Sequence, residues 1–317
     1  MEYRLLGRTG LRLSAIGFGA APLGGVYHPT DFQQASRAVG AAIDAGINYF
    51  DVAPYYGLTL AESRLGEALA GRRKEIILSS KCCRFGFDDF DFSAGRVASS
   101  LEESLARLRT DYLDLLIAHD IEFGDLRQVV EETLPAMQQA RAAGKVRFLG
   151  VSGYPLRVLA HVARQFPLDF LLSYCHDNLL NTRLQTELLP LAQERGLGLI
   201  NASPLHMGVL TEEGPPEWHP APAELFEAGR QVVAICRRHG VAPATVALRF
   251  ALDEPGLSST LVGMTSVAEL ETNLRALDYR LPPNLLAEIQ HVIAPVRDLE
   301  WPSGRPEHEH LPSLPNS

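Results

Sequence analysis

The stretch NYFDVAPYYGLTLAESRLGEALAGRRKEIILSSK, residues 48–81, decides the fold class because it holds a complete strand–helix–strand unit. Its two ends, residues 48–52 and 75–81, are short apolar runs of the kind that form buried strands. Residues 61–71 between them carry apolar side chains at helical spacing. Two strands joined by a helix are typical of a parallel sheet.

The same alternation continues along the rest of the chain. Further strands are predicted at residues 13–20, 113–120, 146–153, 169–175, 197–204 and 258–264. Further helices are predicted at residues 32–46, 94–108, 126–144, 156–166, 184–196, 223–240, 242–252 and 266–277. Eight strand–helix pairs are what a closed parallel (β/α)8 barrel requires.

A doubly wound open sheet is the competing fold, because it shows the same alternation. The count of eight strands and the lack of a Pro/Ser-rich linker favour the α/β class and a (β/α)8 TIM barrel. We therefore expect one domain over residues 1–317, with additional helices near 223–252 and 283–293 and C-terminal loops over the active-site face. The polar end, about 300–317, is expected to be partly flexible, with His308 and His310 solvated and no metal site.

Composition and charge exclude several function classes. The chain has 317 residues, of which 46% are hydrophobic and 21% charged, and a net charge of −9. An acidic chain has no electrostatic footprint for nucleic acid, and no apolar run reaches the ~18 residues that a membrane span needs. Four irregularly spaced cysteines and the lack of a signal-like N-terminus predict a cytoplasmic protein without disulfides or a zinc ribbon. Its oligomeric state is expected to be a monomer or a weak homo-oligomer.

One glycine motif needs separate treatment. GFGAAP, residues 17–22, resembles the G-x-G-x-x-G fingerprint that follows the first strand of a dinucleotide-binding domain. Pro22 stands where the third glycine would allow close helix packing, so a Rossmann site is not expected.

Polar side chains at the strand ends indicate where the chemistry lies. In a (β/α)8 barrel the active site is built at the C-terminal ends of the strands. Asp51, Lys81 and His119 end three neighbouring strands, and Tyr55 and Tyr56 follow Asp51 closely. Lys81 and Asp51 are expected to pair, and a cation beside a phenol would lower its pKa from about 10 and make it a usable acid–base group. Each residue alone also fits a structural or solvated role.

These residues resemble the catalytic tetrad of the aldo-keto reductase family, which is built on a (β/α)8 barrel. The family's tyrosine lies five residues after the aspartate and just before a glycine, which selects Tyr56 over Tyr55. The resemblance implies Asp51, Tyr56, Lys81 and His119 as catalytic residues and a nicotinamide cofactor. It runs from LGRTGLRLSAIGFGAAPLGG to TLVGMTSVAELETN, which is nearly the whole chain.

The resemblance also implies a cofactor site. Gly19, Ala20 and Asp51 would edge the nicotinamide, and Ser152 would hold its carboxamide, with Gly153 replacing a side chain that many members have. Tyr174 or its neighbour Ser173 would add to this contact, and Ala202 leaves no aromatic ring to stack on the nicotinamide. The remaining contacts would run along the pyrophosphate to the adenosine end, through Ser203, Leu205, Gly208, Gly263, Thr265, Ser266, Glu269 and Asn273.

A narrower resemblance concerns the substrate. The segments GFGAAPLGGVY, AHDIEFG, LLSYCHDN and WPSG are similar to the plant L-galactose dehydrogenase branch, whose members oxidise the C1 hydroxyl of an aldose to a lactone with NAD. This implies a sugar site in which Tyr27, Trp218 and Trp301 would contact the ring and His119 would orient the C1 oxygen. Loop packing is an equally good explanation for each tryptophan.

The resemblance leaves three functions in competition. The first is an NAD-dependent aldose 1-dehydrogenase, for L-galactose first and for L-fucose or another aldose second. The second is an NADPH-dependent carbonyl reductase using the same site. The third, a barrel that acts as a non-enzymatic subunit, is disfavoured by the intact tetrad. The choice of NAD rests on Ser266 and Glu269, which stand where NADP-using members commonly carry a lysine and an arginine.

Overall fold

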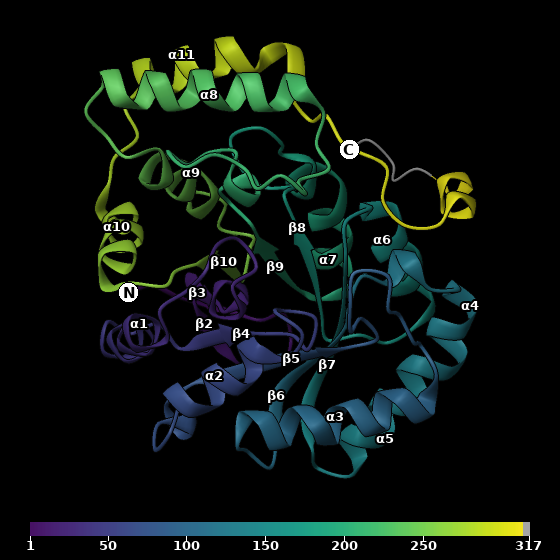
Figure 1. Cartoon of the computed structure of the whole chain (residues 1–317). Helices are drawn as coiled ribbons and strands as arrows, with labels where there is room; N and C mark the ends of the chain where they lie inside the picture. Colours follow the sequence, from purple (N-terminus) through teal and green to yellow (C-terminus); the bar gives the residue numbers. More distant parts are fainter. Residues whose placement is uncertain (313–317) are drawn as a thin grey trace.

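The computed structural model describes residues 1–312, and within them eight parallel strands close into a barrel (Figure 1). Neighbouring strands follow the order β10-β3-β4-β5-β6-β7-β8-β9, so the last strand pairs with the first and the sheet has no free edge. The barrel strands are β3 (Ile16–Gly19), β4 (Tyr49–Asp51), β5 (Ile77–Cys82), β6 (Leu113–Ala118), β7 (Val146–Gly153), β8 (Phe170–Tyr174), β9 (Gly198–Ala202) and β10 (Ser259–Gly263). All eight predicted strands and the (β/α)8 class are confirmed.

Helices surround the barrel and bury one apolar face each. In α3, for example, Val97, Leu101 and Leu105 recur at helical spacing and are buried, and Ser93 caps the first turn. The helices are α1 (Phe32–Asp44), α2 (Leu60–Ala68), α3 (Ala94–Leu108), α4 (Leu126–Gln128), α5 (Leu134–Ala142), α6 (Leu156–Gln165), α7 (Leu189–Arg195), α8 (Ala223–Arg238), α9 (Pro243–Leu252), α10 (Val267–Asp278) and α11 (Pro283–Ile293). The short 3-10 helices are η1 (Ala21–Gly24), η2 (Arg73–Glu75), η3 (Ile121–Phe123), η6 (His206–Gly208), η7 (Ala294–Val296) and η8 (Pro306–His310).

Two predicted helices contain a wider turn. The segment predicted at 126–144 passes through a π-helical turn, η4 (Val129–Thr133), and that at 184–196 through η5 (Leu184–Leu188). Each wide turn comes just before Pro135 or Pro190, which sit in the first turn of the α-helix that follows. Proline cannot donate a backbone hydrogen bond, and its ring clashes with the carbonyl four residues before it, so the turn widens.

The barrel interior sets the direction of the site residues. Tyr49, Leu115, Ile117, Phe170, Leu172, Ile200 and Leu261 pack together with Leu6 and Leu13 inside the barrel. Because successive strand residues point to opposite faces, the same alternation turns Asp51, Lys81 and His119 inward at the C-terminal ends.

An N-terminal hairpin, absent from the prediction, closes the other end of the barrel. Strands β1 (Tyr3–Leu5) and β2 (Arg12–Ser14) pair antiparallel, and the chain turns at Ala15 into β3. The predicted strand 13–20 is therefore two strands. Leu6 lies against Gly198, where β9 begins, and a Cβ atom on that glycine would come 2.3 Å from Leu6.

The additional helices and the C-terminal segment complete the fold. α8 and α11 lie side by side at one edge of the molecule (Figure 1). In the segment from about residue 300, which the composition predicts to be partly flexible, Trp301 and His308 are buried, so His308 is not solvated as expected, whereas His310 is exposed. Residues 313–317 lie outside the described part of the chain. None of the helices within residues 1–312 combines the length and the apolar character needed to cross a bilayer.

Candidate functional site

A buried ion pair lies at the C-terminal ends of β4 and β5. Lys81 Nζ is 2.5 Å from Asp51 Oδ2 and also donates to the Val52 carbonyl at 3.0 Å. Ser79 Oγ donates to the other carboxylate oxygen, Oδ1, at 2.7 Å. Both charged side chains are at most 5% exposed. A buried ion pair whose other hydrogen-bonding groups also have partners is held in one geometry, so it can position a third group.

Tyr56 is placed by a close contact between two glycines. Gly57 has a φ of 61°, and a Cβ atom on it would lie 2.2 Å from the Gly24 oxygen. A Cβ atom on Gly24 would in turn come 2.6 Å from the Tyr56 oxygen. Only glycine fits both positions, and this packs the loop after β4 against η1.

The two tyrosines have different neighbours. Lys81 Nζ lies 4.8 Å from the ring centre of Tyr56, whose ring meets the His119 ring edge-on at 5.7 Å and 88°. The Tyr55 ring is instead covered by Arg84, with Cζ 3.9 Å from its centre. The structure therefore brings Tyr56, and not Tyr55, beside the Asp51–Lys81 pair.

His119 is held as a neutral imidazole. Burial and the positive charges of Lys81 and Arg84 lower its pKa well below 6.5. Its Nδ1 atom is buried and has no hydrogen-bond partner within residues 1–312. Nε2 lies 3.5 Å from Asp120 Oδ2. A neutral imidazole with one nitrogen unpartnered and the other in only a long contact can form a hydrogen bond with the oxygen atom of a ligand.

The pKa of Tyr56 contradicts the sequence-based expectation. Burial, followed by the charges of Asp51 and Asp120, raises the pKa of its phenol well above 10, and Arg84 only partly opposes this. The expected lowering by Lys81 fails because the Lys81 charge is already compensated by Asp51 at 2.5 Å. The phenol is therefore protonated in the free protein.

A second ion pair beside the tetrad was not predicted. Arg84 Nη1 bonds Asp120 Oδ2 at 2.5 Å, and both side chains are largely buried. Asp120 directly follows His119, and its position beside a strand-end histidine is the signal that could have identified it. Nothing in the sequence pattern indicated that Arg84 would reach it from the loop after β5.

The alternation of side chains along β7 and β8 shows which of the predicted residues point into the barrel. Phe170 and Leu172 point inward, so Tyr174 does too, while Ser173 faces outward and bonds Gly153 O and His176. Ser152 also points inward, and its Oγ is buried without a hydrogen-bond partner in the described residues. That hydroxyl is available to an added polar group.

Gly153 faces away from the barrel interior. A Cβ atom on it would come 2.4 Å from Oε2 of the buried Glu122. A side chain is thus missing at this position because the Glu122 carboxyl occupies its space. Gly153 can offer a ligand only its backbone.

Two glycines stand at neighbouring strand ends where the nicotinamide is expected. Gly19 pairs with Asp51 on one side and with Gly263 on the other. Ala20 is buried and donates its backbone N–H to the Asp51 carbonyl at 2.8 Å. No large side chain therefore projects from Gly19, Ala20 or Gly263 at these strand ends.

The loop after β9 has an unusual backbone. Ser203, His206 and Met207 have positive φ values of 57°, 51° and 49°, and Gly208 has 98°. Leu205 in the same loop is half-buried between two apolar clusters. Non-glycine residues with positive φ are strained and gather where a ligand is held.

The N-terminus of α10 holds the remaining predicted cofactor residues. Ser266 caps the helix by accepting from Glu269 N at 3.2 Å, and Glu269 Oε2 accepts from Thr265 N at 2.5 Å. Glu269 is exposed, and Asn273 is buried one turn further along. The unpaired N–H groups of a helix N-terminus favour an anionic ligand.

The predicted sugar contacts divide into two groups. Tyr27 and Trp218 pair with ring centres 5.8 Å apart, and the tetrad-side tyrosines contribute to a raised pKa of Tyr27, so this pair lies near the site. Trp218 is 47% exposed and free to take a ligand. Trp301, in contrast, is 8% exposed and stacks on Tyr154 at 4.3 Å. The prediction for Trp301 is corrected: it is a packing residue.

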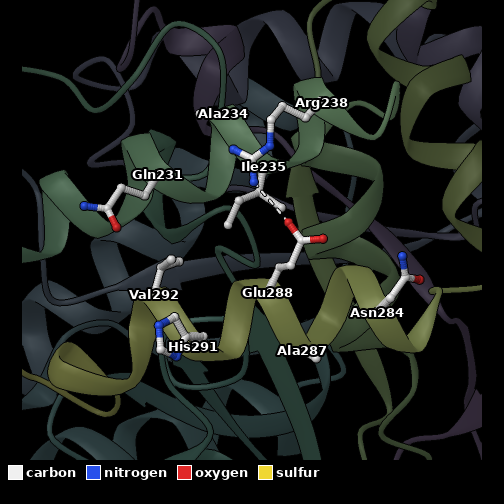
Figure 2. Close-up of a pocket in the computed structure, with 9 residues that line it drawn as sticks. All are labelled: Gln231, Ala234, Ile235, Arg238, Asn284, Ala287, Glu288, His291 and Val292. Atoms are coloured by element: carbon white, nitrogen blue, oxygen red, sulfur yellow. Dashed lines mark hydrogen bonds and ion pairs between the residues drawn. The ribbon is translucent and has the colours of Figure 1, made fainter.

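A groove elsewhere on the surface does not contain the site. It lies between α8 and α11 and has a volume of about 710 Å³ (Figure 2). Ile235 and Val292 line it, and Arg238 bonds Glu288 across it at 3.0 Å. No tetrad residue borders this groove.

Residues 15–294 match the Aldo/keto reductase family over most of the chain. This chain belongs to the aldo/keto reductase family. The sequence-based identification of the family and of its barrel fold is confirmed.

Curated relatives extend over almost the whole chain. An L-galactose dehydrogenase of Arabidopsis thaliana is 46% identical over 314 residues, covering 96% of this chain and 98% of the relative. A D-threo-aldose 1-dehydrogenase of a Pseudomonas species is 32% identical, covering 89% and 94%. Among solved structures, the holo form of an aldo-keto reductase from Bacillus halodurans superposes with a TM-score of 0.78 at 25% identity, covering 98% of this chain and all of that one.

Members of the family use nicotinamide cofactors, and the residues present fit such a group. The unpartnered Ser152 hydroxyl could hold a carboxamide, and the N-terminus of α10 offers backbone N–H groups to a phosphate. The strained loop at Ser203–Gly208 follows β9 and lies between Ser152 and the N-terminus of α10 in the sequence.

Proposed function

We propose that this aldo/keto reductase is an NAD-dependent aldose 1-dehydrogenase that oxidises the C1 hydroxyl of L-galactose to the aldonolactone. The observation that carries the proposal is the buried Asp51–Lys81 pair beside Tyr56 and His119, in a chain 46% identical to an L-galactose dehydrogenase over nearly its full length.

The side chains divide the work as their geometry allows. His119, neutral and unpartnered at Nδ1, donates to the C1 oxygen and orients it. Tyr56 accepts the proton of the C1 hydroxyl as its phenolate, and the charge of Arg84 partly offsets the burial and the carboxylates that raise the pKa of this phenol. When bound, an oxidised nicotinamide would supply the acceptor for the hydride that leaves C1. Loss of a proton and a hydride turns the C1–OH group of the cyclic sugar into the lactone carbonyl.

NAD rather than NADP is proposed on the residues at the start of α10. Ser266 and the exposed carboxylate of Glu269 offer no cation to a 2′-phosphate, and the carboxylate would repel it. Glu269 could instead accept a hydrogen bond from a ribose 2′-hydroxyl.

The choice of L-galactose is more specific than the names of the relatives alone support. Other relatives are named for D-threo-aldoses and for D-arabinose, so aldoses of different configuration are oxidised within this group of proteins. L-galactose is the first choice and L-fucose, its 6-deoxy relative, the second. A cytoplasmic location and a monomeric or weakly oligomeric state remain predictions.

The test is an NAD-reduction screen of the purified protein across L-galactose, L-fucose, D-arabinose, L-glucose and D-galactose. Turnover of L-galactose with NAD supports the proposal. Failure with every aldose, together with efficient NADPH-dependent reduction of simple aldehydes, would establish the carbonyl reductase instead. Absence of any turnover would favour a non-enzymatic barrel.

A further inference from the structure

Asp120 and Arg84 form a charged pair beside the proposed reaction centre. Asp120 directly follows His119, and its Oδ2 atom lies 2.5 Å from Arg84 Nη1 and 3.5 Å from His119 Nε2. Burial first, and then charges that include that of Asp120, raises the pKa of Tyr56 and of Tyr174. The pair therefore borders the place where the C1 oxygen of an aldose would lie.

The two oxygens of this carboxylate are used unequally. Oδ2 takes both the Arg84 contact and the His119 contact, whereas Oδ1 is buried and has no hydrogen-bond partner in the described residues. A carboxylate that served only to hold an arginine would be expected to use both oxygens in a bidentate pair. Leaving a buried carboxylate oxygen without a donor is costly, so the free Oδ1 indicates an acceptor awaiting a ligand.

The chemistry of that ligand follows from the neighbours. Oδ1 of the ionised carboxylate can only accept hydrogen bonds; burial raises the pKa of Asp120, and the positive charge of Arg84 at 2.5 Å opposes this. The carboxylate lies 3.5 Å from Nε2 of the imidazole that would bind the C1 oxygen, so the group within its reach is one on the carbon next to C1. In an aldose the donor on that carbon is the C2 hydroxyl.

We propose that Asp120 Oδ1 accepts a hydrogen bond from the hydroxyl group on C2 of the aldose, with Arg84 holding the carboxylate in place, so that this residue makes the site select sugars over plain aldehydes and deoxysugars. The inference rests on the proposed aldose oxidation and deepens it. A charged acceptor that would be left unpaired rejects an analogue lacking the donor far more strongly than an apolar pocket rejects a missing methylene.

The experiment compares L-galactose with its 2-deoxy analogue in the wild type and in Asp120→Asn and Asp120→Gly. Both replacements suit the positive φ of 49° at this position, so the loop backbone is left unstrained. The wild type should prefer L-galactose by at least about tenfold in kcat/KM. That preference should shrink in Asp120→Asn, which keeps a neutral acceptor, and vanish in Asp120→Gly.

Glu122→Gln provides the matched control. Glu122 is a buried acid two residues along the same loop, and burial raises its pKa to about 8, so an amide replaces a neutral carboxyl at pH 7. This variant should keep the wild-type preference. If Asp120→Gly fails to fold, Asp120→Asn decides the outcome alone.

The outcomes separate this inference from the proposed function. Equal losses on both sugars, an unchanged preference in the Asp120 variants, or a preference that also collapses in Glu122→Gln would overturn the inference. A wild type that oxidises both sugars equally well would overturn it too, while leaving aldose oxidation intact. A wild type that oxidises no aldose with either nicotinamide cofactor would overturn both.

Discussion

The ammonium group of Lys81 lies 4.8 Å from the ring centre of Tyr56, whereas the neighbouring Tyr55 ring is covered by Arg84. Two adjacent phenols thus stand beside two different cations. Each cation pairs with its own buried carboxylate, Lys81 with Asp51 and Arg84 with Asp120, so the two rings lie in different electrostatic surroundings. This difference gives the two tyrosines separable roles that substitutions can test.

Replacing Tyr56 with Phe should lower kcat for aldose oxidation by about 10²–10⁴-fold, because the variant has no group to accept the C1 proton. Tyr55→Phe is the matched control, since it removes the same atom from a ring of similar exposure one residue away. It should keep most of the activity. Steady-state turnover of both variants decides the matter, and an active Tyr56→Phe beside an inactive Tyr55→Phe would reverse the assignment.

The pH profile should follow Tyr56. Its pKa in the free protein is raised well above 10, so the deprotonated form that oxidation needs becomes more abundant as the pH rises. We expect kcat/KM for oxidation to climb about tenfold per unit from about pH 6 to about pH 9, and aldehyde reduction to show no such increase. His119, whose pKa is lowered well below 6.5, should add no step near neutrality. Oxidation that declines between pH 7 and 9 would be inconsistent with Tyr56 as the base.

Gly153→Ala should destabilise the protein by about 1–3 kcal/mol, since its methyl group would overlap the buried Glu122 carboxyl. That carboxyl cannot move freely, because its other oxygen accepts from Tyr154 N at 2.9 Å and Ser303 Oγ at 3.2 Å. Urea unfolding of both single variants and of Gly153→Ala with Glu122→Ala measures the coupling. The cost of the alanine should fall in the Glu122→Ala background, and additive effects would show that the two sites do not touch.

Cofactor preference should change with the first turn of α10. The wild type should show a higher kcat/KM with NAD than with NADP, and a Ser266→Lys, Glu269→Arg double variant should move the ratio toward NADP by supplying two cations. Arg275, in the last turn of α10, is the competing source of positive charge for a 2′-phosphate. A wild-type preference for NADP, or a ratio that does not move in the double variant, would show that the choice is made elsewhere.

The sequence indicates the barrel strands well because each one lies in a short, mainly apolar run between helical segments. Asp51, Lys81 and His119 could be placed together for the same reason, since parallel strand ends meet at one rim. The N-terminal hairpin was not predicted because Tyr3–Leu5 is only three residues long and two of its three side chains are exposed. The GRTG turn, whose Gly7 and Gly10 have positive φ, was its available signal.

The electrostatics of the site could not be read from the sequence. A lysine near a tyrosine suggests a lowered pKa, but the direction depends on how closely Asp51 neutralises that lysine and how deeply the phenol is buried. The place of Glu122 could not be predicted either, because only the folded structure shows that its carboxyl fills the space beside Gly153. Trp301 was equally ambiguous, because only the packing on Tyr154 separates a buried ring from a sugar contact.

The most direct measurement of the central claim uses L-galactose carrying deuterium at C1. Turnover by the purified protein with NAD should transfer the deuterium to the reduced cofactor and yield the lactone, both detectable by mass spectrometry. The Tyr56→Phe variant should transfer little. Reduced cofactor without deuterium, or no reduction of NAD by L-galactose, would contradict oxidation at C1 by this site.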